Sequence, residues 1–454
     1  GINYDVTEEE NARRELERVA YEDRLTGLPN REAAIEMLES EATAHAAGDR
    51  WLLVGVLDVV QMRRINRRSG ERVGDALLRA VAGRLSSTFP GFVGRLEMDR
   101  FVLVHPFDGE ADAEAALEAA RDGVEKPCSV GGLTIPVSIR AGYCVHAPDD
   151  DPNAARDAFE SAMLAVDRAK GDRGRAIERY TPAFGEEARR ERVLQERLED
   201  AIPNGEFRLV YQPQIDMRTG GVFGVEALLR WHLPGEGAVP PDVFIPLAER
   251  TGTILRIGDF VAEQAAADVA DWSREGVSLS MISINVSPVQ IADAGFLDYV
   301  DALDRRFATS TSRLKLELEL TESDYIQPSP TNIEKLQAMR ARGIGLSIDD
   351  FGKGYSSLSY LDRFPVDMIK IDRNFVRTIE DGLYAQKIVQ SVRDIAEAIG
   401  ADMVAEGIET KRQAEIVRGC GCCFGQGYLF SAPLDPERIP AAVERGFADA
   451  VPNR

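Results

Sequence analysis

The chain has 454 residues, of which 44% are hydrophobic and 29% are charged, a composition typical of packed globular domains that excludes a fibre or a disordered tail. Its 54 basic and 76 acidic residues give a formal net charge of −22, which argues against a protein that binds nucleic-acid polymers through a basic surface. No apolar run reaches the length of about 18 residues that a membrane span needs, so we expect no membrane contact within this chain.

The first residue is Gly1, so we expect a longer natural protein with an upstream sensor, which could carry a membrane anchor. The five cysteines are few, odd in number and unevenly spread, which indicates a reducing, cytoplasmic location. Thr7 and Glu10 form the pattern of a capping box and predict a charged helix over residues 7–22, the end of that upstream segment.

Residues 23–180 predict a mixed α/β domain. The expected elements are a buried strand at 51–57 that ends in Asp58, a hairpin over 92–104, a strand pair over 133–145, a short strand at 175–180, and helices at 31–47, 73–85 and 154–170. A charged helix at 185–201 follows, and we take residues 181–201 as the linker to the next domain.

In residues 202–454, apolar strands alternate with helical stretches. The eight expected strands are 207–215, 222–231, 281–286, 314–320, 344–348, 368–371, 403–405 and 425–430. Eight strands with helices between most of them predict a (β/α)8 TIM-like barrel. The predicted fold is therefore α/β, with a mixed α/β domain followed by this barrel.

Polar side chains with oxygen atoms stand at or near the ends of almost every predicted barrel strand, namely Glu226, Asn285, Glu319, Asp349, Asp350, Asp372, Glu406 and Gln426. Any one of them could simply cap the next helix. Together they favour an active site, because the carboxyl ends of barrel strands meet on one face. Six of them are carboxylates, which repel each other unless cations neutralise them. An all-oxygen set favours Mg²⁺ or Mn²⁺, and so many acids could hold two ions.

Two further features support phosphoester chemistry. Lys370 precedes Asp372 by two residues, so both side chains are expected on one face, where an ammonium could orient a water molecule or stabilise phosphorane charge. A glycine-rich segment, residues 350–357, follows the acid pair and is either a plain turn or a mobile loop that positions it. Glu322 could anchor that loop.

The second half resembles the EAL family of cyclic di-GMP phosphodiesterases from about residue 190 to 440. The resemblance rests on Glu226-Ala-Leu-Leu-Arg-Trp231, Asn285-Val-Ser287, Glu319-Leu-Thr-Glu-Ser323, Asp349-Asp-Phe-Gly352, Lys370-Ile-Asp372, Glu406-Gly-Ile-Glu409 and Gln426-Gly-Tyr428. It implies hydrolysis of cyclic di-GMP to linear pGpG with two bound Mg²⁺ or Mn²⁺ ions, and a homodimer.

The resemblance also implies roles for individual residues. The metal ligands would be Glu226, Asn285, Glu319, Asp349, Asp350 and Glu406. Lys370 and Asp372 would position and activate the water, and Glu406 would join them as a catalytic group. The substrate would contact Gln212, Arg230 and Gln426, and Glu409 would support the pocket. Lys353 and Cys423 depart from the family pattern without removing a ligand.

The first domain resembles GGDEF diguanylate cyclases, with Asp23-Arg-Leu-Thr-Gly-Leu-Pro-Asn-Arg31 as the entry motif. Its signature is degenerate, because Glu97-Met-Asp-Arg-Phe101 stands where two glycines and two acids belong, so we expect no cyclase activity. Asp58, Asn66 and Asp75 keep the family's metal and guanine positions. Two interpretations stay open: a GTP-sensing regulatory domain, or an inert dimerisation or spacer module.

For the whole chain, the leading hypothesis is a metal-dependent cyclic di-GMP phosphodiesterase. A receptor that binds cyclic di-GMP without cleaving it is the second interpretation. A bifunctional enzyme that also makes cyclic di-GMP is disfavoured by Glu97, Met98 and Arg100.

Overall fold

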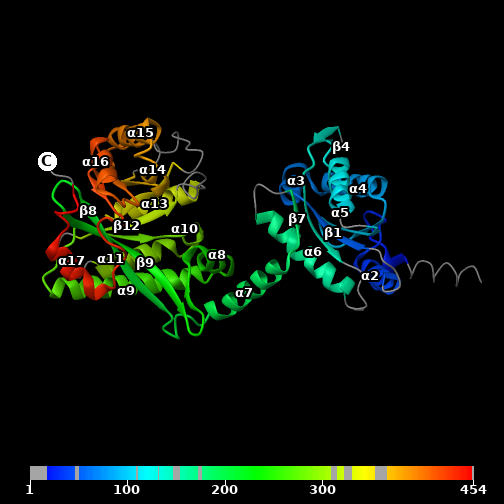
Figure 1. Cartoon of the computed structure of the whole chain (residues 1–454), viewed down its shortest axis with the longest axis horizontal. Coiled ribbons are helices and arrows are strands. Elements are labelled where there is room, and N and C mark those ends of the chain that lie inside the picture. Colours follow the sequence, from blue (N-terminus) through cyan, green and yellow to red (C-terminus); the bar gives the residue numbers. More distant parts are fainter. Residues whose placement is uncertain are drawn as a thin grey trace, which may run out of the picture. The chain divides into compact units, whose positions relative to one another are not determined.

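The computed structural model of the chain describes residues 18–45, 51–108, 111–130, 132–146, 154–171, 176–307, 314–321, 330–352 and 366–451. The chain forms two compact units, residues 1–191 and 192–454, and the division falls within helix α7 (Pro182–Leu198) (Figure 1). Of the helix expected at 7–22, residues 18–21 are helical and the earlier part lies outside the described residues.

The first unit is built on a five-stranded sheet with the order β2-β3-β1-β6-β7. The pairs β2–β3, β3–β1 and β1–β6 are antiparallel, and β6–β7 is parallel. The strands are β1 (Trp51–Val59), β2 (Phe92–Arg95), β3 (Arg100–Phe107), β6 (Ile139–His146) and β7 (Ile177–Arg179). The helices are α2 (Arg31–His45), α3 (Met62–Ser69), α4 (Glu71–Thr88), α5 (Ala111–Val124) and α6 (Ala154–Gly171).

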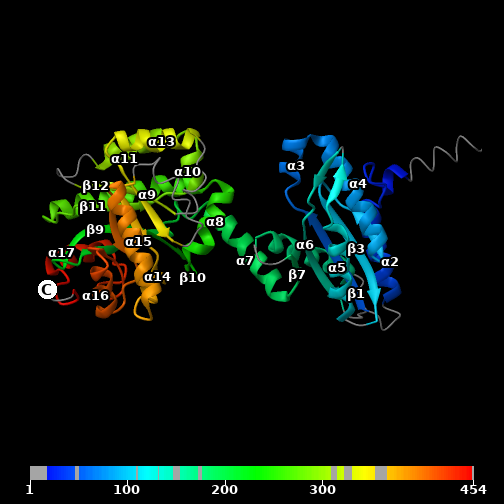
Figure 2. The ribbon, with the colours of Figure 1, turned by 90° about the horizontal axis from the view of Figure 1, so that it is seen from above.

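Both faces of this sheet are buried under helices (Figure 2). Leu53 and Leu57 of β1 belong to a core formed with α4 and α5. Val54 and Val56 point to the opposite face and belong to a second core formed with α2 and α6. Because both sets of alternating side chains are apolar, β1 reads in the sequence as one continuous hydrophobic run.

The hairpin expected over 92–104 is confirmed as β2–β3, but the strand pair expected over 133–145 is wrong. Strand β5 (Leu133–Ile135) instead pairs with β4 (Cys128–Val130) in a separate hairpin, and β6 joins the main sheet beside β1. Pro136 follows β5 directly, and proline has no amide hydrogen to continue a ladder. The two apolar segments therefore enter different sheets.

The second unit is a closed barrel, as predicted. Its strands pair in the order β9-β11-β12-β13-β14-β15-β16-β8, and β8 pairs with β9 to close the ring. The bounds are β8 (Phe207–Asp216), β9 (Gly221–Leu233), β11 (Met281–Asn285), β12 (Lys315–Thr321), β13 (Gly345–Phe351), β14 (Met368–Ile371), β15 (Asp402–Ala405) and β16 (Phe424–Gly425). A short strand, β10 (Gly237–Val239), extends β9 as a hairpin.

The barrel differs from eight parallel strands at β8, which runs antiparallel to both of its neighbours. The reason lies in the connection from β8 to β9. Only residues 217–220 join them, and Gly220 turns the chain with a φ of 77°. A parallel connection needs about a dozen residues or more, so this link can form only a hairpin.

Helices surround the barrel. They are α8 (Pro241–Thr251), α9 (Ile254–Arg274), α10 (Pro288–Ala292), α11 (Phe296–Phe307), α13 (Pro330–Ala341), α14 (Arg373–Arg377), α15 (Leu383–Ile399), α16 (Lys411–Gly419) and α17 (Ile439–Arg445), with a 3₁₀ turn, η2 (Pro436–Arg438). Leu194 and Leu198 from the end of α7 are buried in the same core. In the described parts of the chain, no helix is both long and apolar enough to cross a bilayer.

Strand β12 shows how the barrel buries charge. Leu316, Leu318 and Leu320 belong to the hydrophobic core, whereas Glu317 and Glu319 alternate with them and contact side chains of β13 and β14. A strand sends successive side chains to opposite faces, so the glutamates point into the barrel and the leucines toward the helices. The sequence pattern thus places acids inside a closed sheet.

Candidate active site

The centre of the candidate active site is the ammonium group of Lys370 on β14, whose side chain is only 1% exposed. Its Nζ atom lies 2.7 Å from Glu319 Oε2 and 2.8 Å from Glu406 Oε1. It lies 3.1 Å from Glu226 Oε2 and 3.6 Å from Asp349 Oδ1. One cation therefore gathers carboxylates from β9, β12, β13 and the end of β15.

The negative charge of this group exceeds what Lys370 can neutralise. Burial and the neighbouring carboxylates raise the pKa of Glu319, and burial raises the pKa of Glu406 to about 8. Burial alone would lower the pKa of Lys370, but the surrounding carboxylates raise it well above its ordinary value. These contacts favour Lys370 as a cation and hydrogen-bond donor within the cluster.

Amide side chains hold Glu226 in place. Asn285 Nδ2 donates to Glu226 Oε1 at 3.0 Å, and Gln426 Nε2 donates to Glu226 Oε2 at 2.8 Å. Gln426 Nε2 also donates to Gln212 Oε1 at 3.0 Å, which ties β8 to the loop after β16. The antiparallel strand β8 thus contributes to the site even though it runs against its neighbours.

A second group of acids lies beside this cluster. One oxygen atom from each of Asp349, Asp350 and Glu406 lies within 4.8 Å of the others, a spacing at which they could hold a metal ion. Asp350 adopts the left-handed region with a φ of 57°, which is uncommon for a residue with a side chain. Its backbone amide donates to Asp349 Oδ1 at 2.8 Å.

The residues of this face fit a hard divalent cation. Four carboxylates (Glu226, Glu319, Asp349 and Glu406) surround a single ammonium, and Asp350 adds a fifth acid beside Asp349 and Glu406. Glu319 Oε1 is buried and makes no hydrogen bond within the described residues, so it is an acceptor that lacks a donor. Oxygen ligands and surplus negative charge are what Mg²⁺ and Mn²⁺ prefer.

The remaining residues predicted for the barrel site have more varied positions. Asp372 follows β14 directly, is fully buried and caps α14 by accepting from the amide of Asn374 at 2.9 Å. Arg230 is partly buried and donates to the carbonyl of Leu229 at 2.9 Å, and burial lowers its pKa. Glu409 is exposed, with its amide donating to Gln413 Oε1. Glu322 and Lys353 lie outside the described residues.

The cysteines near residue 420 do not form a metal site in the described residues. Cys420 Sγ contacts the carbonyl of Gln386 at 3.8 Å, and Cys422 Sγ contacts the carbonyl of Met403 at 3.3 Å. Cys423 accepts a hydrogen bond at its backbone carbonyl from the amide of Met217. They pack as part of the barrel, where Cys422 is fully buried.

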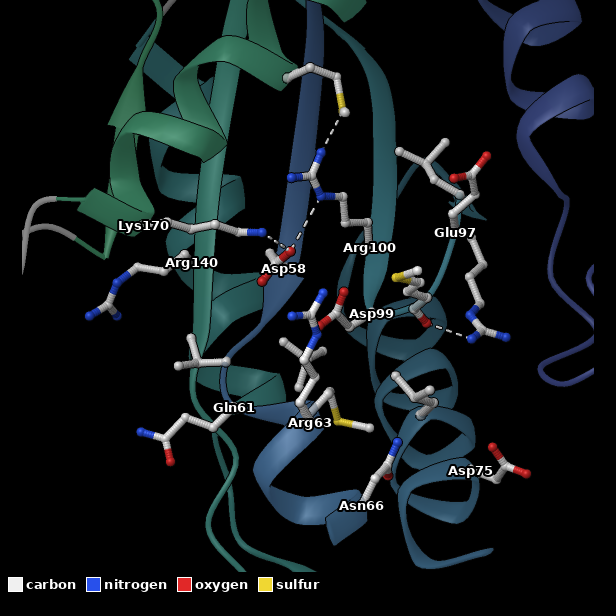
Figure 3. A pocket seen from close by; sticks show the side chains of 18 of the residues that line it. Asp58, Gln61, Arg63, Asn66, Asp75, Glu97, Asp99, Arg100, Arg140 and Lys170 are labelled. Atoms are coloured by element: carbon white, nitrogen blue, oxygen red, sulfur yellow. Dashed lines mark hydrogen bonds and ion pairs between the residues drawn. The ribbon is translucent and has the colours of Figure 1, made fainter. Parts of the chain in front are cut away.

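The first unit contains a pocket of about 1000 Å³ (Figure 3). Asp58 at the end of β1, Asn66 on α3 and Asp75 on α4 all line it, as do Asp99 and Arg100 at the β2–β3 hairpin. The structure thus brings the three residues predicted for GTP binding to one cavity.

The sequence does not predict that two cations, Lys170 and Arg100, form ion pairs with Asp58. Lys170 Nζ lies 2.5 Å from Asp58 Oδ2, and Arg100 Nε lies 3.3 Å from the same oxygen. Arg100 also pairs with Asp167. Lys170 and Asp167 belong to α6, far along the chain from Asp58, and a helical pattern alone does not say which strand end its charged residues will meet.

Two family models match the chain. The EAL domain model matches residues 195–433, which is more than half of the chain. The model described as diguanylate cyclase, GGDEF domain matches residues 20–175. Among solved structures, a PaMucR phosphodiesterase in complex with c-di-GMP is 37% identical to this chain, with a TM-score of 0.51. The match covers 54% of this chain and 99% of that one.

Two relatives from Pseudomonas aeruginosa match nearly the whole chain. The cyclic di-GMP phosphodiesterase PA2567 is 34% identical over 92% of this chain and 71% of its own length. The bifunctional diguanylate cyclase/cyclic di-GMP phosphodiesterase MucR is 32% identical over 95% of this chain and 63% of its own length. The chain spans about half the length of other curated relatives it matches, 54% and 53% in two of them. The chain therefore belongs to the family of tandem proteins in which a GGDEF domain precedes an EAL domain.

Proposed function

We propose that the barrel hydrolyses cyclic di-GMP to linear pGpG and that the first domain regulates this activity without making cyclic di-GMP. The observation that carries the proposal is the cluster of acids in the barrel, in which Glu226, Glu319, Asp349 and Glu406 contact Lys370 and Asp350 lies beside Asp349 and Glu406. The relatives with phosphodiesterase in their names support the choice of substrate.

Two Mg²⁺ or Mn²⁺ ions are the proposed cofactors. Glu226, Asn285, Glu319, Asp349, Asp350 and Glu406 would hold them. When bound, such ions would supply Lewis-acid polarisation of the phosphoryl oxygens and neutralise their charge.

The chain's own residues would then position the reaction. Lys370 donates hydrogen bonds and would orient the attacking water, while Asp372 would accept its proton. The water oxygen forms a bond to phosphorus, the bond from phosphorus to the ribose O3′ breaks, and that oxygen takes a proton. Gln212, Arg230 and Gln426 would bind the dinucleotide, and the buried Gln426 Oε1 makes no hydrogen bond within the described residues. Glu409 would support the pocket from its outer side.

The first domain is proposed to bind GTP through Asp58, Asn66 and Asp75, and a homodimer is proposed for the assembly. The alternative for this domain is an inert spacer or dimerisation module. It is favoured if phosphodiesterase kinetics are the same with and without GTP and calorimetry detects no GTP binding.

The decisive experiment is chromatographic analysis of cyclic di-GMP incubated with the purified chain. We expect pGpG with Mg²⁺ or Mn²⁺, little with Ca²⁺ because its looser coordination suits the site poorly, and none with EDTA. Glu226→Gln should abolish turnover, whereas Glu444→Gln on the exposed face of α17 should not. Tight binding without product in Mn²⁺ would replace the proposal with a receptor, and cyclic di-GMP formed from GTP alone would restore a bifunctional enzyme.

A further inference from the structure

The pocket of the first unit differs in charge from the cluster in the barrel. Six basic side chains (Arg31, Arg63, Arg95, Arg100, Arg140 and Lys170) and five acidic ones (Asp58, Glu71, Asp75, Glu97 and Asp99) line it. In the barrel cluster, four carboxylates contact one lysine, and Asp350 lies beside two of them. The acids of the barrel cluster therefore outnumber its single cation, whereas basic and acidic side chains are nearly equal in number among the residues that line the pocket.

The individual contacts at the strand end agree with this balance. Asp58 stands at the family's metal position. Its Oδ2 atom already forms ion pairs with the ammonium of Lys170 and the guanidinium of Arg100. Arg100 forms ion pairs with two acids, Asp58 and Asp167. A divalent ion at Asp58 would have to displace both cations and then lie beside them. These residues do not fit a divalent metal ion.

Other cations of the pocket remain available to an anion. Arg140 donates to the carbonyl of Ile139, and no ion pair of Arg63 or Arg140 occurs among the described residues. In Figure 3, Lys170 and Arg140 lie on the same side of the view; the Lys170 ammonium points toward Asp58, and the Arg140 guanidinium points away from it. Phosphate oxygens are strong acceptors that arginine and lysine bind well.

The other end of the pocket is suited to a polar ring. Figure 3 shows Asn66 and Asp75 there, away from Lys170 and Arg140. Asn66 Oδ1 is buried and makes no hydrogen bond among the described residues. Asn66 can lie there because Gly74 faces it: a Cβ atom at position 74 would come within 1.9 Å of Asn66 Oδ1. An amide and a carboxylate at one end and cations at the other match the two ends of a nucleotide.

We propose that this pocket binds a nucleoside triphosphate as the metal-free anion, with Arg100 and Lys170 standing where a divalent ion would otherwise be. The phosphates lie among Lys170, Arg100, Arg140 and Arg63, and the base lies against Asn66 and Asp75. This inference rests on the proposed binding of GTP and adds that magnesium takes no part in it.

The test is isothermal titration of the full chain with GTP, once in EDTA and once in Mg²⁺. The expected affinity in EDTA is at least as high as in Mg²⁺, because magnesium screens the phosphates from the pocket's own cations. Inorganic tripolyphosphate in EDTA should bind more weakly than GTP, because it lacks the base.

Arg100→Glu tests the residue that replaces the ion. Reversing this charge should weaken GTP binding in EDTA about ten- to hundredfold, since charged hydrogen bonds are lost. Added Mg²⁺ should restore part of the lost affinity in Arg100→Glu, because Asp58 has lost one of its cations there. It should restore none in Arg140→Ala, because Asp58 keeps both of its cations in that variant. If Arg100→Glu melts early by circular dichroism, Arg140→Ala and Arg63→Ala still report on the phosphate end.

The outcomes separate the two claims. GTP binding that occurs only with Mg²⁺ overturns the metal-free inference and leaves the proposed GTP site standing. Absence of binding in both buffers overturns both. Tripolyphosphate that binds as tightly as GTP overturns the assignment of the base to Asn66 and Asp75.

Discussion

The guanidinium of Arg168 lies over the ring of Phe184, 4.2 Å from its centroid. Arg168 belongs to α6 and also pairs with Glu187, so two contacts join α6 to α7. Helix α6 also carries Lys170, which holds Asp58 in the pocket. Helix α7 ends at Leu198 in the core of the barrel. The contacts of Arg168 thus join the helix that carries Lys170 to the first turns of α7.

Under the proposed regulation by GTP, Arg168→Ala should weaken the effect of GTP on the phosphodiesterase while leaving GTP binding intact, because the side chain contacts α7 and does not line the pocket. The measurements are the affinity for GTP by calorimetry and the change in kcat/KM for cyclic di-GMP on adding GTP. Arg192→Ala, which removes an exposed pair with Glu196 on α7, is the matched control. A full GTP response in Arg168→Ala would remove this contact from the route.

Lys370→Met should make the barrel depend on a divalent cation for stability. Removing the ammonium leaves a buried set of carboxylates without their cation, which typically costs about 3–5 kcal/mol. The urea midpoint in EDTA should fall, and Mn²⁺ should raise it again toward that of the unaltered chain. Lys387→Met, on the exposed side of α15, should behave alike in both buffers. An unchanged midpoint for Lys370→Met in EDTA would contradict the charge balance derived for this site.

Tyr211→Phe should destabilise the barrel without touching the acid cluster. The Tyr211 hydroxyl is buried and donates to Asp268 Oδ2 at 2.5 Å, while Gln264 donates to the other oxygen at 2.9 Å. Loss of the hydroxyl leaves a buried carboxylate short of one donor, at a cost of about 1–3 kcal/mol in the free energy of unfolding. Tyr384→Phe, at a side chain 77% exposed, is the control and should cost nothing measurable.

Asp23→Asn should destabilise the first unit in a pH-dependent way. Burial raises the pKa of Asp23, but hydrogen bonds from Thr26 and Arg95 outweigh burial and lower it. A lowered pKa means that ionised Asp23 stabilises the fold above its unfolded pKa of about 3.9 and that this contribution is lost as the pH falls further.

The unfolding free energy of Asp23→Asn should therefore be lower by about 1.5–3 kcal/mol at pH 7, because charge-assisted hydrogen bonds are lost. As the pH falls below the unfolded pKa of about 3.9, the difference between the variant and the unaltered chain should shrink, because Asp23 then becomes protonated. Urea titrations at several pH values measure the difference. Asp122→Asn, at a side chain 70% exposed, gives the baseline. A difference that stays constant with pH would mean that the charge of Asp23 is not what stabilises the unit.

Much of the barrel site was predictable because strand periodicity and strand ends are local properties. Glu319 and Glu406 were expected near strand ends and Glu226 within the predicted strand 222–231, and the structure brings all three to Lys370. What the sequence did not reveal is that Lys370 contacts several carboxylates at once. That depends on the curvature of a closed sheet, which brings β9 and β14 face to face across the barrel.

The unpredicted features share a different cause. The pairing of Lys170 with Asp58 depends on how α6 lies against β1, and helix periodicity does not encode that docking. The antiparallel direction of β8 could have been predicted, because the link at 217–220 is too short for anything but a hairpin. The separate hairpin ending at Ile135 likewise follows from Pro136.

The left-handed backbone at Asp350 changes how any substitution there should be interpreted. Residues with a side chain hold this conformation at a cost of about 1–3 kcal/mol, and aspartate and asparagine tolerate it best. Alanine at position 350 would lose an oxygen and also favour another backbone path, so an alanine scan would merge two effects. Asparagine changes the charge while keeping the turn, and glycine relaxes the turn while deleting the oxygen. Comparing these two replacements therefore separates the effect of the carboxylate on binding from the effect of the backbone conformation at this position.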